Sequence, residues 1–600
     1  MYVVATAGHV DHGKSTLVRA ITGIEPDRWD EEKRRGLTID LGFAWTTTPS
    51  GNEVSFVDVP GHERFLGNML AGIGPAPVVC FVVAADEGWR QQSDDHRDAV
   101  RALGIEHGVV VISRIDLAPD RVPEVVTQIR RELSDTGLRD APIVPVSAVT
   151  GEGLDQLLAT LDRVLVTVPK PPADSRIRFW IDRAFTIKGA GTVVTGTLSA
   201  GTVRPDDRLV LAGSHGAQEV TVRGVQEHGA VVPSAGPANR VALNLRSPGA
   251  DQIHRGDVLL TRGDWQLADV VDVRRTSGVP CHDAAGEVIV HIGTAAVRAH
   301  LRPFDEDTAR LTLVRALPLT IGDRMILRNN GSQRIAGGVQ VLDVDPPALR
   351  RRGDGRRRAA ALAADDPAGP IRAEVARRGA MRVADLRRLG VIVPDHPVDG
   401  LRTDADWWID ERRLHEWAAG LRAAVEDDRA RNPLSSGLSH KAAADAIALP
   451  DVVLLGVVVR EAELAVHGPS VTTSQASEDL GPAEAAVSEV ERRLQEAPFA
   501  APEADELTEL GLGRRELAAA ERTGRLLRLA DGVVLLPTAP AQAMRELVKL
   551  PRVFTTSEAR GALRTTRRVA IPLLEHLDAR GWTRRIDAGH RTVVRAGVDG

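Results

Sequence analysis

The stretch GHVDHGKST at residues 8–16 follows the apolar run YVVATA and decides the fold of the region around it. Its glycines, Lys14 and Ser15 have the spacing of a phosphate-binding P-loop, which is a turn between a strand and a helix. Backbone N–H groups of such a loop surround phosphate oxygens, Lys14 places its charge on the β- and γ-phosphates, and the Ser15 hydroxyl ligates Mg²⁺. The pattern therefore predicts a nucleoside triphosphatase.

Two further motifs follow in the order that a GTP-hydrolysing switch requires. RRGLTID at residues 34–40 supplies a threonine hydroxyl that can ligate Mg²⁺ only when a γ-phosphate is present. DVPGH at residues 58–62 follows the strand-like run EVSFV and supplies an aspartate for the Mg²⁺ shell, a glycine N–H for the γ-phosphate and a histidine beside the attacking water. The predicted catalytic residues are Lys14, Thr38 and His62, and the predicted Mg²⁺ ligands are Ser15, Thr38 and Asp58.

The base-reading loop departs from the Asn-Lys-x-Asp string that is usual in guanine-specific GTPases. Residues 113–116 read Ser-Arg-Ile-Asp, so Asp116 keeps the two acceptors that guanine needs and Arg114 can lie flat on the base. Ser113 is too short to copy the amide, so we expect guanine specificity with weaker binding and easier exchange; the need for an exchange factor stays open. PVSAVTG at 145–151 fits the last loop under the base. The predicted nucleotide-binding residues are Gly8, His9, Val10, Asp11, His12, Gly13, Lys14, Ser15, Thr16, Asp58, Gly61, Arg114, Asp116, Ser147 and Ala148.

The three nucleotide motifs resemble those of translational GTPases of the elongation factor Tu type. The resemblance implies that His62 orients the hydrolytic water, and that Val10 and Leu37 form an apolar gate that the ribosome opens. It also implies that intrinsic hydrolysis is very slow and that the ribosome is the activator. The expected cofactors are GTP or GDP with Mg²⁺.

Length, composition and cysteine usage agree with a large globular factor. The chain has 600 residues, of which 43% are hydrophobic and 26% charged, and this predicts about four or more domains. Its two cysteines, Cys80 and Cys281, argue against a disulfide framework or a zinc site and suit a reducing compartment. With no visible signal peptide and no apolar stretch of ~20 residues, we expect a cytoplasmic protein that is a monomer.

The sequence pattern changes twice along the chain, which predicts a multidomain fold. Alternating strands and helices indicate an α/β P-loop GTPase domain, short β-runs with Gly and Pro turns then indicate two β-barrels, and a repeated helix, helix and hairpin unit indicates tandem winged helices. RRRGDGRRR falls in the linker between the barrels and this last region. The predicted segments are the GTPase domain at 1–170, the barrels at 176–264 and 265–345, a basic linker at 346–365, and winged helices at 366–430, 431–475, 480–540 and 541–600.

The barrel region carries a second, more specific resemblance. IDRAFTIKGAGTVVTGT at 181–197 and NRVALNLRSPGADQIHRGDVLL at 239–260 are similar to the second domain of the selenocysteine-specific elongation factor, or SelB, family. The resemblance implies a pocket for the aminoacyl end of the tRNA, lined by Asp182, Arg183 and Arg240. Guanidinium donors favour an ionised selenol over a neutral seryl group, by ~2–4 kcal/mol. The alternative is that Asp182 and Arg183 form an ion pair on the barrel rim.

The net charge of −6 conceals a basic C-terminal end, since the last fifty residues contain ten arginines against five acidic residues. The final winged helix is similar to the SelB module that binds the selenocysteine insertion hairpin of mRNA, in which arginines hold the backbone and a wing or helix end reads a splayed base. The alternative is a solvated charged face. The predicted RNA-binding residues are Arg564, Arg567, Arg568, Arg584, Arg585, His590 and Arg591.

The nucleotide motifs predict a GTP-dependent factor, and the resemblance to the SelB family implies that it delivers selenocysteinyl-tRNA to the ribosome at UGA codons marked by an mRNA hairpin. Its expected partners are selenocysteinyl-tRNA, the insertion hairpin and the ribosome. Three alternatives stay open at this point: a general aminoacyl-tRNA carrier, a nucleotide-metabolism GTPase such as the subunit of a sulfate-activating enzyme, and a GTP-switched RNA-binding regulator that carries no tRNA.

Overall fold

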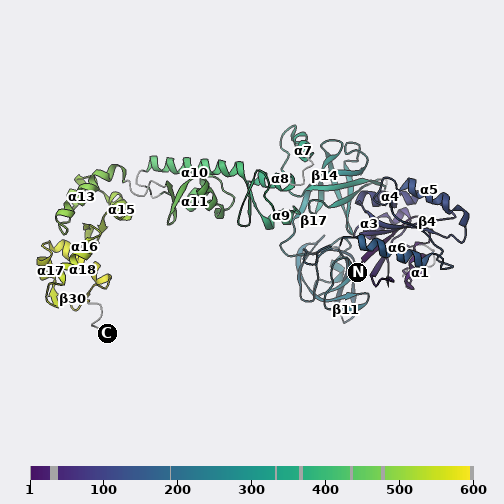
Figure 1. Cartoon of the computed structure of the whole chain (residues 1–600), viewed down its shortest axis with the longest axis horizontal. Helices are drawn as coiled ribbons and strands as arrows, with labels where there is room; N and C mark the ends of the chain where they lie inside the picture. The colour runs from purple at the N-terminus through teal and green to yellow at the C-terminus, as the bar shows by residue number, and fades with distance from the viewer. Residues whose placement is uncertain are drawn as a thin grey trace. The chain divides into compact units, whose positions relative to one another are not determined.

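The computed structural model describes residues 2–26, 38–169, 171–189, 191–331, 334–363, 369–432, 435, 437–473 and 480–594 (Figure 1). The chain divides into two compact units, one of residues 1–374 with 382–396 and one of residues 375–381 with 397–600. Within these described ranges, no helix is long and apolar enough to cross a membrane.

A six-stranded sheet forms the centre of the first domain, in the order β2-β3-β1-β4-β5-β6. Neighbouring strands run parallel, except that β2 is antiparallel to β3. Helices α1 and α6 cover one face and α3, α4 and α5 the other, each with its own buried apolar cluster (Figure 1). Because both faces are covered, a central strand such as β4 is apolar throughout. The strands are β1 Tyr2–Ala7, β2 Gly42–Thr47, β3 Glu53–Asp58, β4 Val78–Ala84, β5 His107–Ser113 and β6 Ile143–Pro145, and the helices are α1 Lys14–Thr22, α3 Leu66–Ile73, α4 Gln91–Leu103, α5 Val122–Glu132 and α6 Leu154–Thr167.

Two β-barrels follow in the first unit. The strands of the first have the order β11-β10-β12-β8-β7-β13-β9 and close through β9 and β10, and those of the second form a closed ring β14-β17-β16-β15-β18-β19. Buried and exposed residues alternate along strands such as β16, because one face of each strand points into the barrel. The strands are β7 Arg178–Ile187, β8 Gly191–Leu198, β9 Arg208–Gly213, β10 Gly216–Glu227, β11 Ala230–Val232, β12 Asn239–Leu245, β13 Val258–Thr261, β14 Leu267–Gly278, β15 Glu287–Ile292, β16 Ala295–Pro303, β17 Thr308–Pro318, β18 Arg324–Asn329 and β19 Ile335–Asp343.

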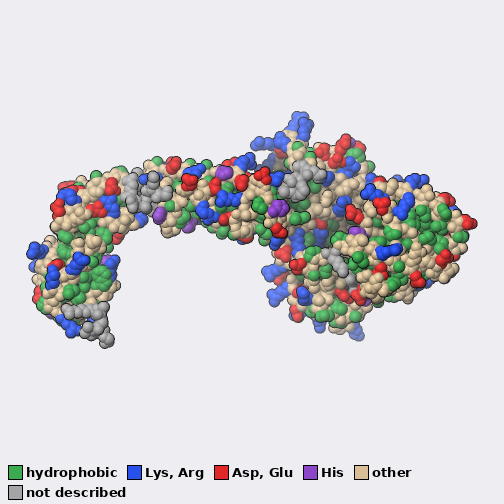
Figure 2. All heavy atoms as spheres, viewed as in Figure 1, with side chains coloured by type: hydrophobic (Ala, Val, Ile, Leu, Met, Phe, Trp, Pro, Cys, Tyr) green, Lys and Arg blue, Asp and Glu red, His purple; other side chains and the backbone are tan. Residues whose placement is uncertain are grey.

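The segment predicted as a basic linker contains a helix, α7 Asp354–Leu362, that is fixed to the second barrel. Arg358 on this helix pairs with two buried barrel carboxylates, Asp272 at 2.6 Å and Asp343 at 2.5 Å. Asp272 also pairs with Arg310 at 2.7 Å, so two guanidiniums balance two carboxylates. Arg358 is therefore a structural residue, while the other arginines of the cluster are exposed, and Figure 2 shows basic side chains gathered over α7.

Short helices and small antiparallel sheets build the region after α7. The boundary between the two units passes through α8, and α9 belongs with the barrels, where the Leu389 carbonyl accepts a hydrogen bond from Ile321 N at 3.0 Å. The helices are α8 Gly369–Arg378, α9 Val383–Leu389, α10 Glu411–Arg431, α11 His440–Ala446, α12 Leu455–Glu461, α13 Glu484–Glu496, α14 Ala504–Glu509, α15 Arg514–Arg522, α16 Ala539–Leu547, α17 Thr556–Ala562 and α18 Arg567–Ala579. The strands are β20 Ala380–Arg382, β21 Leu401–Asp404, β22 Trp407–Asp410, β23 Leu438–Ser439, β24 Leu464–His467, β25 Ser470–Thr473, β26 Leu527–Arg528, β27 Val534–Leu535, β28 Val553–Thr555, β29 Thr583–Arg585 and β30 His590–Val593.

The last two predicted winged helices share one hydrophobic core. A single buried apolar cluster runs from Leu480, before α13, to Leu577 on α18. In the terminal module, helices α17 and α18 precede the β29–β30 hairpin, and the strand order is β28-β30-β29. With the P-loop domain and the two barrels, this winged helix confirms the predicted fold class.

Candidate functional site

The P-loop forms the turn from β1 into α1, as predicted. Lys14 begins α1 and is buried, and its ammonium donates hydrogen bonds to the carbonyl oxygens of Gly8 at 3.0 Å and His9 at 2.8 Å. Gly8 has φ of 126°, and a Cβ there would lie 2.1 Å from the Val82 carbonyl oxygen, so only glycine fits. The loop backbone and the Lys14 charge are thus placed where a helix N-terminus can bind phosphate.

The three predicted Mg²⁺ ligands meet beside the P-loop. The Ser15 hydroxyl donates to Asp58 Oδ2 at 2.6 Å and lies 2.9 Å from the Thr38 hydroxyl oxygen. Two hydroxyls and a carboxylate are oxygen ligands of the kind that Mg²⁺ prefers, so the residues fit this cation. In the part of the chain that the structure describes, there is no cluster of three or more His, Cys, Asp or Glu residues that could hold a metal.

Sequence reasoning missed Thr6, which holds Asp58 in place. The Thr6 hydroxyl donates to Asp58 Oδ1 at 2.7 Å and accepts from Val59 N at 3.0 Å, and its side chain is fully buried in β1. A polar residue inside the apolar run YVVATA was the available signal. Thr6 is a positioning residue for the predicted Mg²⁺ shell.

The DVPGH segment packs closely against the P-loop. A Cβ on Gly61 would lie 2.5 Å from both Lys14 Nζ and Val10 N, so the chain can pass here only without a side chain. His62 follows and caps the short helix Glu63–Phe65, where its Nδ1 accepts a hydrogen bond from Arg64 N at 3.2 Å. Val10 is half-buried in the loop, while Leu37, the other residue of the predicted apolar gate, lies outside the described residues.

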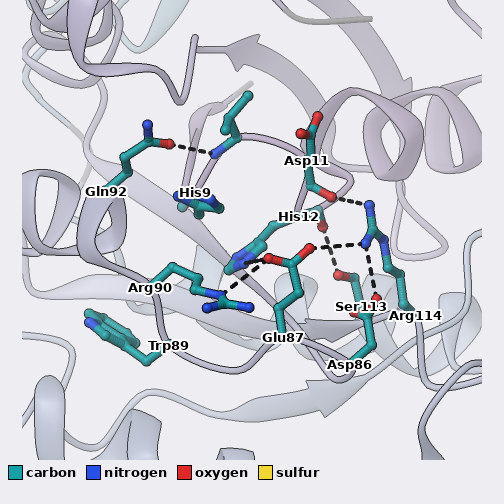
Figure 3. A network of polar contacts seen from close by, with 12 residues as sticks. His9, Asp11, His12, Asp86, Glu87, Trp89, Arg90, Gln92, Ser113 and Arg114 are labelled. Carbon is teal, nitrogen blue, oxygen red and sulfur yellow. Dashed lines mark hydrogen bonds and ion pairs between the residues drawn. The ribbon is translucent and has the colours of Figure 1, made fainter.

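A polar network ties the base-reading loop to the P-loop (Figure 3). The Ser113 hydroxyl donates to the His12 carbonyl oxygen at 2.7 Å, which gives this serine a role that its short side chain can fill. The Arg114 guanidinium donates to the Asp11 carbonyl and pairs with Asp86 at 3.2 Å and Glu87 at 3.4 Å. Sequence reasoning missed both acidic residues, which compete with a base for Arg114.

The remaining predicted base contacts surround this network. Asp116 is exposed, so its carboxylate is accessible to a base, whereas Ser147 is buried and accepts from Thr150 N at 3.2 Å. Ala148 is half-buried beside it. The guanine-reading roles of these residues stay predictions.

Burial keeps a P-loop histidine neutral. Desolvation, together with the nearby His9, lowers the pKa of His12 to about 3, and the two rings stack edge to face with centroids 5.0 Å apart. The positive charge that the loop offers to a phosphate at neutral pH therefore comes from Lys14 rather than from His12.

In the predicted aminoacyl pocket on the first barrel, Asp182 does not form its ion pair with the next residue in the sequence, Arg183. A register shift in β7 between Ile181 and Arg183 places Asp182 in a buried position. Asp182 pairs with Arg240 at 3.0 Å and accepts from the Thr195 hydroxyl at 2.7 Å. The alternative of an Asp182–Arg183 rim pair is therefore corrected to an Asp182–Arg240 pair.

Arg183 and Arg240 both contact the segment that follows Thr38. Arg183 Nη2 donates to Asp40 Oδ2 at 3.0 Å and to the Leu41 carbonyl oxygen at 2.6 Å. The Arg240 guanidinium lies 3.3 Å from the centroid of the Phe43 ring. The structure brings all three predicted pocket residues together. It adds Phe43 and also Asp40, the last residue of the RRGLTID motif, to which no role had been assigned.

Only some of the residues predicted to bind RNA on the terminal winged helix are exposed to solvent. Arg564, Arg567, Arg584 and Arg585 are exposed, and His590 lies on the hairpin beside Asp587, 3.0 Å from its carboxylate. Two predicted residues are corrected. Arg591 is buried and pairs with Asp578 at 2.9 Å, and Arg568 donates to the Ala501 and Pro502 carbonyls at 2.9 and 3.1 Å. Both of these arginines hold the fold.

Four family models match the chain. Residues 1–167 match "Elongation factor Tu GTP binding domain", residues 191–260 match "Elongation factor Tu domain 2", residues 271–348 match "Selenocysteine-specific elongation factor, beta-barrel domain" and residues 545–592 match "Elongation factor SelB, winged helix". The P-loop domain with its two barrels places the chain among the translational GTPases of the elongation factor Tu type, which bind guanine nucleotides.

Curated proteins with similar sequences indicate which kind of translational GTPase the chain resembles. The selenocysteine-specific elongation factor of Escherichia coli (strain K12) is 35% identical over 366 residues, and that of Desulfomicrobium baculatum is 34% identical over 400 residues. These matches cover 58% and 64% of this chain but only 56% and 63% of the relatives. The elongation factor 1-alpha of Pyrococcus furiosus is 31% identical over 294 residues, which are 68% of that protein, so the chain belongs to the family of these translational elongation factors. Within this family, the selenocysteine-specific relatives and two family models indicate a SelB-type factor. A crystal structure of a bacterial selenocysteine-specific elongation factor has the same fold, with a TM-score of 0.78 and 24% identity over 99% of this chain and 100% of that one.

Proposed function

We propose that the protein hydrolyses GTP to deliver selenocysteinyl-tRNA to the ribosome at UGA codons, and that its terminal winged helix binds the mRNA hairpin that marks them. The observation that carries the proposal is the cluster of Asp182, Arg183 and Arg240 on the barrel face next to the GTPase domain. The three guanidiniums of Arg183, Arg240 and Arg255 lie beside only two carboxylates, those of Asp40 and Asp182. The excess positive charge suits an ionised selenol and gives no comparable contact to a neutral seryl group.

The nucleotide site supports the hydrolytic half of the proposal. Lys14 binds the β- and γ-phosphates, and His62 orients the water that attacks the γ-phosphate. Ser15, Thr38 and Asp58 would hold Mg²⁺, which neutralises phosphate charge when it is bound. Thr38 joins this set of ligands from the RRGLTID segment, whereas Ser15 belongs to the P-loop. Loss of the γ-phosphate therefore removes an interaction that holds the Thr38 segment against the nucleotide.

The C-terminal module supports the targeting half. Arg567 at the start of α18 and Arg584 and Arg585 on the hairpin are exposed, as contacts to phosphates require. Binding the hairpin raises the local concentration of the tRNA complex at one codon. A general aminoacyl-tRNA carrier has no need of such a module.

The test of this function is protection of the aminoacyl ester. Selenocysteinyl-tRNA is incubated with the intact protein and either GTP or GDP, and the half-life of the ester is measured. A carrier lengthens the half-life in GTP and much less in GDP. A GTP-switched regulator that carries no tRNA leaves the half-life unchanged in both nucleotides, and that result would refute the proposal.

A further inference from the structure

A short polar chain joins the nucleotide site to the aminoacyl pocket, and Asp40 is its first member. Asp40 lies two residues after Thr38, whose hydroxyl oxygen is 2.9 Å from Ser15 Oγ. Its two carboxylate oxygens accept from two barrel arginines, Arg183 Nη2 at 3.0 Å and Arg255 Nη2 at 2.6 Å. One three-residue stretch therefore touches a predicted Mg²⁺ ligand at one end and the pocket at the other.

Arg255 collects contacts from both segments that sense the nucleotide. Besides Asp40, its Nη1 donates to Asn68 Oδ1 at 2.7 Å, and Asn68 lies on α3, the helix that follows DVPGH. Asn68 Nδ2 in turn donates to the Ile39 carbonyl oxygen at 2.9 Å. Finally, Arg255 Nε donates to the Asp182 carbonyl oxygen at 3.1 Å, which is backbone of the pocket itself. Arg255 thus contacts both segments and the backbone of the pocket at once.

These contacts lie in partly buried surroundings, where charges act more strongly than on an open surface. The side chains of Asp40, Arg183 and Arg255 are 22%, 22% and 27% exposed. Asp40 accepts a charge-assisted hydrogen bond on each of its two carboxylate oxygens, one from Arg183 and one from Arg255. Arg183 donates its hydrogen bonds to Asp40 and to the Leu41 carbonyl from the same nitrogen, Nη2. Asp40 and Leu41 therefore fix the direction in which this guanidinium nitrogen points.

We propose that Asp40, Asn68 and Arg255 form the linkage through which the bound nucleotide shapes the aminoacyl pocket, with Asp40 as the positioning residue for Arg183. The inference rests on the proposed function, because it concerns the same aminoacyl end. While Thr38 is held at the nucleotide, Asp40 holds Arg183 in the orientation that favours an anion. Release of residues 38–40 removes that contact, and the pocket loses its preference for the ionised selenol.

The test measures the affinity of the intact protein for selenocysteinyl-tRNA and seryl-tRNA, each with a non-hydrolysable GTP analogue and with GDP. Asp40→Asn keeps the shape of the side chain and removes its charge. We expect this variant to bind selenocysteinyl-tRNA at least about tenfold more weakly with the GTP analogue, equivalent to about 1.4 kcal/mol. Its affinity for selenocysteinyl-tRNA with GDP, and its affinity for seryl-tRNA with either nucleotide, change less than about threefold. The ratio of selenocysteinyl-tRNA affinity with the GTP analogue to that with GDP therefore falls. Asp40→Glu restores the charge and most of the ratio.

A control variant loosens a different contact between the same two domains, one that involves none of Asp40, Asn68 and Arg255. His228 on the first barrel stacks on Trp45 with ring centroids 5.1 Å apart, and its Nε2 lies 2.8 Å from Ser55 Oγ. We expect His228→Ala to change binding of both tRNAs by a similar factor, which is the pattern of a docking contact.

Three results would overturn the inference: Asp40→Asn follows the His228→Ala pattern, it leaves the ratio between nucleotide states unchanged, or it strengthens selenocysteinyl-tRNA binding, as expected if Asp40 merely competed with the selenolate. If the unaltered protein binds selenocysteinyl-tRNA in neither nucleotide state, the proposed function itself fails and the inference fails with it. The unaltered protein thus separates the two failures.

Discussion

The hydroxyl of Thr6 provides a sharp test of how the nucleotide site is built. Thr6→Val replaces the hydroxyl with a methyl group of similar size in a fully buried position. Packing is preserved, while the 2.7 Å bond to Asp58 and the 3.0 Å bond accepted from Val59 N are both lost. A hydrogen bond to a charged group contributes about 1.5–3 kcal/mol, and a loss of that size weakens binding by about 10- to 150-fold. We expect the Mg²⁺ concentration needed for GTP binding to rise by at least about tenfold.

The assay is a Mg²⁺ titration of the affinity for a fluorescent GTP analogue. Thr6→Ser is the matched control, because it keeps the hydroxyl and is expected to stay within about threefold of the unaltered protein. If Thr6→Val needs no more Mg²⁺ than Thr6→Ser, then Asp58 is positioned by other contacts and the reasoning is wrong.

Three further predictions follow. Asp116→Asn moves nucleotide preference from guanine towards xanthine, measured by competition binding, and an unchanged preference would mean that the base-reading loop lies elsewhere. Replacing exposed Arg584 and Arg585 with glutamate weakens binding of a stem-loop RNA from a selenoprotein mRNA by about tenfold or more, whereas GTP binding is unchanged. Equal RNA affinity would mean that the β29–β30 hairpin of the protein does not bind this RNA. Burial lowers the pKa of His291 to about 3, below its unfolded value near 6.5, so the unfolded chain binds the extra proton and stability falls as the pH drops below about 6.5, by at most about 1.4 kcal/mol per pH unit. His291→Gln flattens this dependence in thermal unfolding, and parallel curves for the two proteins would contradict it.

Local motifs made the nucleotide site predictable, because the P-loop and the DVPGH segment specify backbone as well as side chains. The spacing of Lys14, Ser15 and Asp58 around two strands was sufficient to expect their meeting beside α1. The change from alternating strands and helices to short β-runs likewise predicted the barrels, since each barrel strand alternates between a buried and an exposed face.

Contacts between distant segments were beyond the sequence. Asp182 and Arg183 are adjacent and of opposite charge, yet the register shift in β7 sends them to different partners, Arg240 and Asp40. Arg591 was predicted as an RNA-binding residue of the hairpin, but it is buried and pairs with Asp578. In each case the partner lies in another strand, helix or domain, and no periodicity records that proximity.

The shared core of the last two modules also changes how the RNA surface should be tested. Deleting residues 541–600 would remove α17, α18 and most of α16 from the single apolar cluster that also contains Leu480 and Leu507, and would leave the rest of that cluster exposed. Loss of RNA binding in such a truncation would not distinguish unfolding from loss of the arginines. Surface charge reversal avoids this ambiguity.

The measurement that tests the central claim most directly compares GTP-dependent binding of selenocysteinyl-tRNA with that of seryl-tRNA on the same tRNA body. It uses the intact protein and an Arg240→Ala variant, which removes the partner of the buried Asp182. The account predicts tight binding of the selenocysteinyl form alone in GTP, and its loss in the variant. Equal binding of both forms, or unchanged selectivity in the variant, would contradict it and would reduce the Asp182–Arg240 pair to a structural contact.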